Sequence, residues 1–417
     1  MWMRLGAPMG RPWLSRVPAG SASRGRGAAI AVTRRAPRTR DRTTDDGGTA
    51  MTGIAELVAE VVDYSINQSH AHKPMDALDG WATEDLTYEP VPQRSVDWDS
   101  ERTPGAVPMP RRIMAHTIDA AYHYADGLAG LRDSVSRAGW GRERMATIAD
   151  EPESLIAALH AALDHVCERI ADLSDHDLDQ SARETWGGTA SKALVALEGG
   201  ILHPAWHLGQ IAMLQSWRQA EVAGFELVPP GGQPSEFPYP ADRARGLETV
   251  ATRHEVCRLV ADRAFDGSPT LSLRPVVASI SEAELAWKPF PEIDDPWWCK
   301  AGWTQVLHTW SPKLVYIDHA LGDRKLQYGE ESSALVGGKW GDTDPQRQLG
   351  ALDRTHEIML QRLDAATDED LRRVNPMHID HPMTGWQAVV CMAQHDSWHA
   401  GQLALMRDVA ILLHRKR

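Results

Sequence analysis

A short pattern that occurs twice constrains the fold of this 417-residue chain more than any other feature. Residues 202–211 read LHPAWHLGQI and residues 394–403 read QHDSWHAGQL, so both contain H-x-x-W-H-x-G-Q followed by an aliphatic residue. An upstream histidine follows the same offset of 192 residues, because His116 matches His308. In each copy, 87 residues separate the first histidine from the second, and four more lead to the third. Recurrence at a fixed interval predicts two copies of one structural unit.

Other landmarks recur as well and divide the chain. Residues 84–92 parallel residues 283–291 at an offset of 199, so one connection differs by seven residues between the copies. A stretch rich in Pro and Gly breaks any regular element between the copies. We therefore expect four regions, which also suits a chain too long for one core. They are a disordered basic tail at 1–50, a helical bundle at 51–226, a Pro/Gly-rich linker at 227–245 and a second bundle at 246–417.

The first fifty residues differ in charge from the rest of the chain. They hold ten Arg and three Asp, a net charge of +7, and the total of −13 leaves −20 for the remainder. Their Arg-rich composition without any period predicts disorder. They are either an export or transit segment or upstream sequence before a natural start at Met51, and the absence of a sustained apolar stretch favours the second. The acidic body argues against nucleic acid as a partner.

Composition places the body among soluble intracellular proteins. Apolar residues make up 42% and charged residues 24%, which is usual for globular domains. The four cysteines form no C-x-x-C pair, so neither a disulfide framework nor a thiolate metal site is indicated, and we expect a reducing cytoplasm. No apolar run approaches the roughly 18 residues that span a bilayer, so we expect no membrane contact.

Apolar residues recur at three- and four-residue spacing through most of both copies, which predicts helices. In the second copy the predicted helices span roughly 249–264, 303–321, 346–366 and 384–413. Strand-like alternation is scarce. Four helices and one long connection per copy predict an all-α fold of two tandem four-helix bundles, a fold that can build a metal site from facing helices.

The repeated histidines fit the pattern of a metal site. Residues four apart on a helix share one face, so the paired histidines of each motif can direct both rings to one ion. A third histidine from another helix would occupy a third position of the metal's coordination sphere and leave the remaining position for water or substrate, as in catalytic sites. The predicted ligands of a divalent metal are His116, His203, His207, His308, His395 and His399.

Other residues of the motif are candidates for contacts around the metal or with substrate. They are Gln210, Gln402, Trp206 and Trp398. The glutamines share the face of the histidines and are placed to orient a ligand or hold substrate, and the tryptophans suit pocket walls. Gly209 and Gly401 let the backbone of a neighbouring helix, or a ligand, come close.

Simpler interpretations stand beside this one. With 18 histidines, chance gives about 0.8 H-x-x-x-H pairs, so only the shared W, G, Q and third histidine distinguish these pairs from satisfied core histidines. In the first copy the helix either begins at Pro204 or kinks there and swings His203 away from His207. Five histidines without a repeated partner are expected on the surface or in the core: His123, His160, His165, His319 and His356.

These residues resemble the DinB-like family of bacterial four-helix bundles, which carry a histidine on the second helix and H-x-x-x-H followed by G-Q on the fourth. The resemblance covers nearly everything after residue 51, twice over. It implies an up-down-down-up bundle and a three-histidine site for zinc, nickel or a similar ion in each copy. The wider family includes transferases and isomerases that use the thiols mycothiol or bacillithiol. Its members are usually single domains and often dimers, so the fused pair suggests a monomer whose two bundles pair like a homodimer.

Two functional classes follow. One is an enzyme, in which a metal held by three imidazoles generates a nucleophile from a thiol or water at neutral pH. Transfer of a thiol to an electrophilic small molecule is the leading version, with hydrolysis behind it. The other is a non-catalytic bundle that metal stabilises or that senses a small ligand. Asp119 and Asp396 are the candidates for a general base, on proximity in sequence alone.

Overall fold

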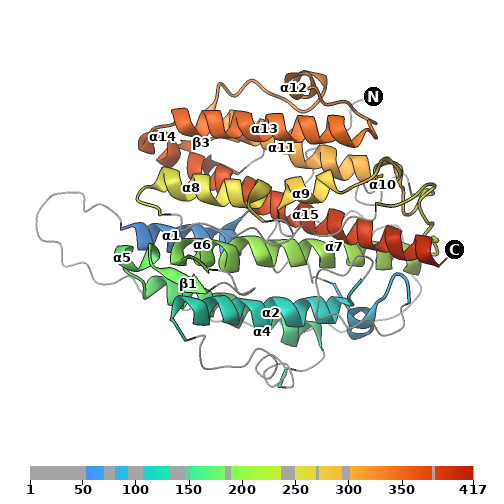
Figure 1. Cartoon of the computed structure of the whole chain (residues 1–417), viewed down its shortest axis with the longest axis horizontal. Coiled ribbons are helices and arrows are strands. Elements are labelled where there is room, and N and C mark those ends of the chain that lie inside the picture. The colour runs from blue at the N-terminus through green and yellow to red at the C-terminus, as the bar shows by residue number, and fades with distance from the viewer. Residues whose placement is uncertain are drawn as a thin grey trace, which may run out of the picture. The chain divides into compact units, whose positions relative to one another are not determined.

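The structure is a computed structural model of the chain. It describes residues 53–69, 80–92, 107–131, 147–148, 151–183, 189–235, 249–268, 272–293, 301–377 and 381–416. Residues from Thr52 to Arg417 form one compact unit, and the basic tail predicted at 1–50 lies outside the described residues. The described part is helical apart from two short pairs of strands, in agreement with the predicted all-α fold (Figure 1).

In the first half of this unit, four long helical segments lie within the described residues. They are α1 (Ile54–Asp63), α2 (Pro110–Leu128), α4 (Pro152–Ala171) and the consecutive α6 (Lys192–Leu197), η6 (Glu198–Leu202) and α7 (His203–Val222). Three short turns, η2 (Tyr64–Gln68), η4 (Thr83–Thr87) and α5 (Asp175–Leu178), connect them. Proline at the first position of α2 and of α4 is preorganised for a helix start. α2 packs against α4 and α7, while α1 packs against α4 and α6.

The second half repeats this order of elements. Its long helices are α8 (Arg253–Asp262), α11 (Gly302–Leu321), α13 (Pro345–Ala365) and α15 (Gly385–Arg415). The shorter ones are η7 (Arg263–Gly267), α9 (Leu273–Ala278), α10 (Glu282–Ala286), α12 (Glu330–Val336) and α14 (Asp368–Arg372). The predicted boundaries of α11, α13 and α15 hold within two residues. The helix predicted at 249–264 is shorter and continues as the π turn η7.

A small hairpin precedes the last helix of each half. β1 (Ser181–Arg183) pairs with β2 (Thr189–Ser191), and β3 (Val374–Asn375) pairs with β4 (Met383–Thr384). Each hairpin ends on the residue that caps the helix. Ser191 Oγ accepts the Leu194 N–H at 3.2 Å, and Thr384 Oγ1 accepts the Gln387 N–H at 3.3 Å. The helical segment α6–η6–α7 and the helix α15 therefore begin at equivalent caps.

One extra residue separates the cap from the motif in the first half. Ser191 precedes His203 by 12 positions, whereas Thr384 precedes His395 by 11. The π turn η6 absorbs this residue, because the His203 N–H bonds the carbonyl of Glu198, five residues back rather than four. Pro204 then falls in the first turn of α7, where it has no N–H to leave unpaired.

The closest association between the halves is that of α7 with α15, which make the most extensive contact of any two elements (Figure 1). Two motif glycines make it possible. A Cβ on Gly209 would lie 2.0 Å from the Trp398 carbonyl oxygen, and a Cβ on Gly401 would lie 1.9 Å from that of Trp206. The contact is reciprocal, so both glycines serve the approach of a neighbouring backbone.

The motif tryptophans, Trp206 and Trp398, also belong to the two helices that make this contact. Trp206 of α7 is 4% exposed and packs in a cluster whose other buried members all belong to the second half. Trp398 of α15 is 6% exposed and packs in the cluster that includes the first-half core. Separating the halves would expose the indole of Trp206, so the first half completes a core cluster of the second.

The described part of the predicted linker lies against the second half. The Val228 N–H donates to the Pro289 carbonyl at 2.9 Å, and Trp287 Nε1 donates to the Val228 carbonyl at 2.7 Å. Residues 236–245 lie outside the described residues.

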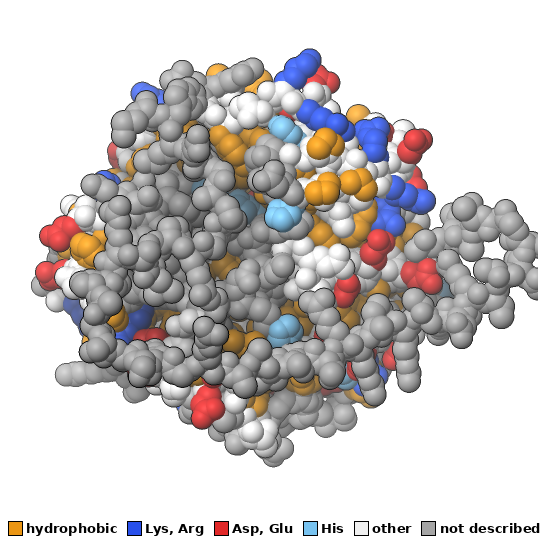
Figure 2. All heavy atoms as spheres, turned by 180° about the vertical axis from the view of Figure 1, so that it is seen from behind, with side chains coloured by type: hydrophobic (Ala, Val, Ile, Leu, Met, Phe, Trp, Pro, Cys, Tyr) orange, Lys and Arg blue, Asp and Glu red, His pale blue; other side chains and the backbone are white. Residues whose placement is uncertain are grey.

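Among the described helices, none is both long and apolar enough to cross a membrane. On the face in Figure 2, the described acidic and basic side chains lie intermixed.

Candidate metal centres

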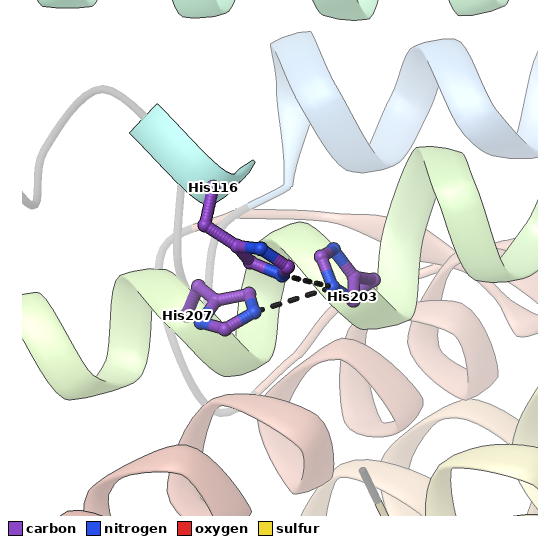
Figure 3. A group of neighbouring side chains, drawn as sticks. All are labelled: His116, His203 and His207. Atoms are coloured by element: carbon purple, nitrogen blue, oxygen red, sulfur yellow. Dashed lines mark hydrogen bonds between the residues drawn. The ribbon is translucent and has the colours of Figure 1, made fainter. Parts of the chain in front are cut away.

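The first group of histidines joins two helices of the first half. His116 projects from α2, and His203 and His207 project from successive turns of α7 (Figure 3). One nitrogen of each ring lies within 4.8 Å of the others. His203 and His207 are fully buried. The predicted alternative in which Pro204 turns His203 away from His207 is therefore wrong for this structure.

The distances within this first triad suit a shared ion. His203 Nε2 lies 3.3 Å from His116 Nε2 and 3.2 Å from His207 Nε2. Ligand nitrogens about 2.0–2.1 Å from a tetrahedral ion stand about 3.3 Å apart. A ring nitrogen carries one hydrogen or one lone pair, so His203 Nε2 can hydrogen-bond only one of its two neighbours. An ion at the centre accounts for both contacts.

The second triad has nearly the same arrangement. His308 comes from α11, and His395 and His399 come from α15. The ring centroids of His308, His395 and His399 lie 5.1, 5.0 and 4.4 Å apart. The corresponding separations in the first triad are 5.2, 4.7 and 4.5 Å. Burial lowers the pKa of His308 to about 4, so this imidazole stays in the neutral form that binds metal well below pH 7.

The predicted outer residues take different positions. Gln210 Oε1 lies 3.0 Å from His207 Nδ1 and accepts its hydrogen, a bond that fixes the tautomer with Nε2 free for metal. Gln402 is 5% exposed at the equivalent position, and its Oε1 has no hydrogen-bond partner among the described residues. The indole of Trp206 lies edge-on to His207, 4.7 Å between centroids. Trp206 thus borders the first triad and also packs among buried residues of the second half.

A buried ion pair beside the second triad was missed by the sequence analysis. Lys313 of α11 donates to Asp396 Oδ2 of α15, and both side chains are 0% exposed. Lys313 Nζ also lies 5.1 Å from the centre of the Phe265 ring. Burial raises the pKa of Asp396 to about 6 against the opposing effect of Lys313, so the carboxylate is ionised at neutral pH. The signal was a departure from the repeat, since Ala121 and Pro204 occupy these positions in the first copy.

Both candidate general bases lie close to another titratable side chain. The carboxylate of Asp396 is held by Lys313. Asp119 Oδ2 lies 3.7 Å from His123 Nε2, one helical turn away on α2. His356, expected on the surface or in the core, is buried against Phe265, with the two rings stacked at 3.9 Å.

Comparison with known proteins identifies part of the chain. The family model of the DinB superfamily matches residues 271–403, a span that includes His308, His395 and His399. Residues 271–403 are thus similar to the DinB superfamily, a span that covers less than half of the chain. Searches of curated proteins and of solved structures found no match. The first half shares the H-x-x-W-H-x-G-Q motif and the order of elements with the second, but the family match does not extend to it.

Proposed function

We propose that the chain is a metal-dependent enzyme built from two tandem DinB-like four-helix bundles, each with one divalent ion on three histidines. The observation that carries this is the convergence of three imidazoles from two helices, found twice. Zinc and nickel are the leading metals because the resemblance to the DinB-like family implies them, whereas three imidazoles alone suit copper and iron as well. The chain is proposed to act as a monomer on a small molecule, with α7 and α15 in the contact that a dimer would otherwise supply.

Three histidines leave part of the coordination sphere open, which is typical of catalytic rather than structural sites. A divalent metal bound there lowers the pKa of a thiol or water ligand and so supplies a nucleophile near neutral pH. The histidines hold the ion, and Gln210 keeps His207 in the tautomer that faces it. The buried indole of Trp206 lies edge-on to His207 and excludes water from that side of the ring.

Transfer of a low-molecular-weight thiol of the mycothiol or bacillithiol type to an electrophile is our leading reaction. Metal-assisted hydrolysis is the second candidate. The thiol reaction is ranked first because a thiol starts from a much lower pKa than water, so the same metal converts more of it to the nucleophilic form near neutral pH. A non-catalytic, metal-stabilised bundle is the remaining alternative.

Metal analysis of the purified protein tests the sites. We expect about two ions per chain in the wild type and the loss of about one in each of His207→Ala and His399→Ala, because each removes one of three ligands. His165→Ala is a suitable control, since that histidine lies on α4 outside both triads. Unchanged metal content in both triad variants would contradict the assignment.

Turnover tests the reaction. Metal-loaded protein is incubated with a panel of electrophiles and with mycothiol or bacillithiol, and consumption of the thiol is followed with and without a chelator. Thiol-dependent turnover that a chelator abolishes supports the transferase. If no substrate is consumed and the chelator only lowers the melting temperature, the enzyme proposal fails and the metal-stabilised bundle stands.

A further inference from the structure

The Lys313–Asp396 pair joins the two helices that carry the second triad. Lys313 lies five residues after His308 on α11, and Asp396 directly follows His395 on α15. The pair therefore bridges α11 and α15 within about a turn of the histidines on each. Both side chains are fully buried, so water does not compete for either charge.

Buried charges demand a defined geometry. Taking a lysine and a carboxylate out of water is costly unless the two remain in direct contact, so the pair resists any sliding of α11 along α15. The Phe265 ring lies 5.1 Å from Lys313 Nζ and stacks on His356 at 3.9 Å between centroids. The same sliding would separate His308 from His395 and His399.

The first half has no ion pair at the positions equivalent to Lys313 and Asp396. Ala121 and Pro204 stand at the equivalent positions, and Ile66 and Leu163 replace Phe265 and His356. Buried apolar side chains pack there without a directional bond. The first triad thus offers a comparison within the same chain.

From this juxtaposition we propose that Lys313 and Asp396 are positioning residues for the second triad. They hold α11 and α15 in the register at which His308 meets the histidine pair, and so set the metal affinity of that site alone. The proposal rests on metal binding by the triads as proposed above.

Cobalt(II) binding measures the effect, because its visible absorption reports both affinity and coordination. Each site is isolated in the full chain by silencing the other, with His207→Ala leaving the second triad and His399→Ala leaving the first. We expect Lys313→Met and Asp396→Asn to weaken cobalt binding at the second triad at least tenfold. Binding at the first triad should stay within twofold of its unmodified value.

A double variant separates positioning from stability. Each single substitution leaves one buried charge without its partner. The double variant Lys313→Met with Asp396→Leu removes both charges, so it should regain the melting temperature of the unmodified protein. It should still bind cobalt at least tenfold more weakly at the second triad. Arg362→Met is the matched control, because Arg362 bonds Asp318 at 2.6 Å and joins α11 to α13 instead.

The outcomes distinguish the two proposals. Wild-type affinity at the second triad in the double variant, or equal weakening of both triads, would overturn the positioning role. Equal weakening by Arg362→Met would also overturn it, because any loss of stability would then suffice. If neither isolated triad binds cobalt in otherwise unmodified protein, the metal proposal itself fails.

Discussion

The two halves reach nearly the same arrangement of three histidines along different local routes. In the first half the motif helix contains a π turn followed by Pro204, and no buried charge bridges α2 and α7 at the positions of Lys313 and Asp396. In the second half α15 is α-helical through 31 residues, and a buried ion pair ties it to α11. The ring separations nevertheless agree within 0.3 Å, as the values above show. The position of the histidines is thus maintained while the surrounding backbone and core differ.

Deletions in the motif helices test this comparison most severely. Removing Gly199 together with Pro204→Ala should convert the π turn into a continuous α-helix like α15, with the protein folded and the first triad still binding one ion. Deleting Val390 from α15 should rotate the segment before it by about 100° and turn Trp386 and its neighbours off the core. We expect that deletion to cost more than about 4 kcal/mol or to prevent folding, measured by urea denaturation and metal content. Equal damage from both deletions would show that η6 does not simply absorb an extra residue.

At the close contact between α7 and α15, an added side chain at Gly209 or at Gly401 should be equally destabilising. Gly209→Ala and Gly401→Ala each place a Cβ about 2 Å from a backbone oxygen, which cannot rotate away as a side chain could. We expect each to lower the free energy of unfolding by roughly 3 kcal/mol, at the upper end for overpacking. Gly350→Ala is the control, because that glycine is exposed in α13 with nothing within 4 Å of its Cβ position, and it should stabilise by about 0.5–1 kcal/mol. A large difference between the two crossing variants would mean that the contact is not reciprocal.

The sequence could predict those features that depend on the periodicity and spacing of residues along the chain. The helices and the grouping of His308 with His395 and His399 depend on periodicity and spacing, which are written along one chain. The π turn also had a local signal, the one-residue difference between the Ser191 and Thr384 intervals, although only the structure identifies both residues as caps.

Other features depend on contacts between elements, which spacing does not determine. The repeat shows that Lys313 and Asp396 depart from their equivalents, but their contact requires the register of α11 against α15. The placement of Trp206 among buried residues of the second half requires the packing of one half on the other. For that reason the sequence suggested a role for the motif glycines in close approach without identifying the partner.

Acid should destabilise the second half through His356, a residue that the first half replaces with Leu163. Burial lowers the pKa of His356 to about 4, with the bond to Asp262 opposing the shift. Because the folded pKa lies below the unfolded value near 6.5, the unfolded chain binds the proton first, and stability is lost as the pH falls from 6.5 towards 4. His356→Leu should therefore remove roughly 2 kcal/mol of the loss between pH 7.5 and pH 5.

Urea denaturation at a series of pH values measures this difference. His165→Leu, on the corresponding helix α4, is the control and should follow the wild type, because His165 is a quarter exposed and pairs with Glu168 at the surface. The assignment is wrong if His356→Leu and the wild type lose the same stability over this range.

The smallest expected effect concerns the motif glutamines. Gln210 accepts the Nδ1 hydrogen of His207, whereas Gln402 makes no such bond in the described structure. Gln210→Leu should weaken cobalt binding at the first triad about tenfold, because loss of an outer hydrogen bond frees the ring to rotate and to change tautomer. Gln402→Leu should weaken the second triad by less than about threefold, because the Lys313–Asp396 bridge already holds its helices. If the two substitutions weaken their sites equally, metal draws Gln402 into the bond that Gln210 already makes, and the triads then differ only in their bridges and not in how their rings are oriented.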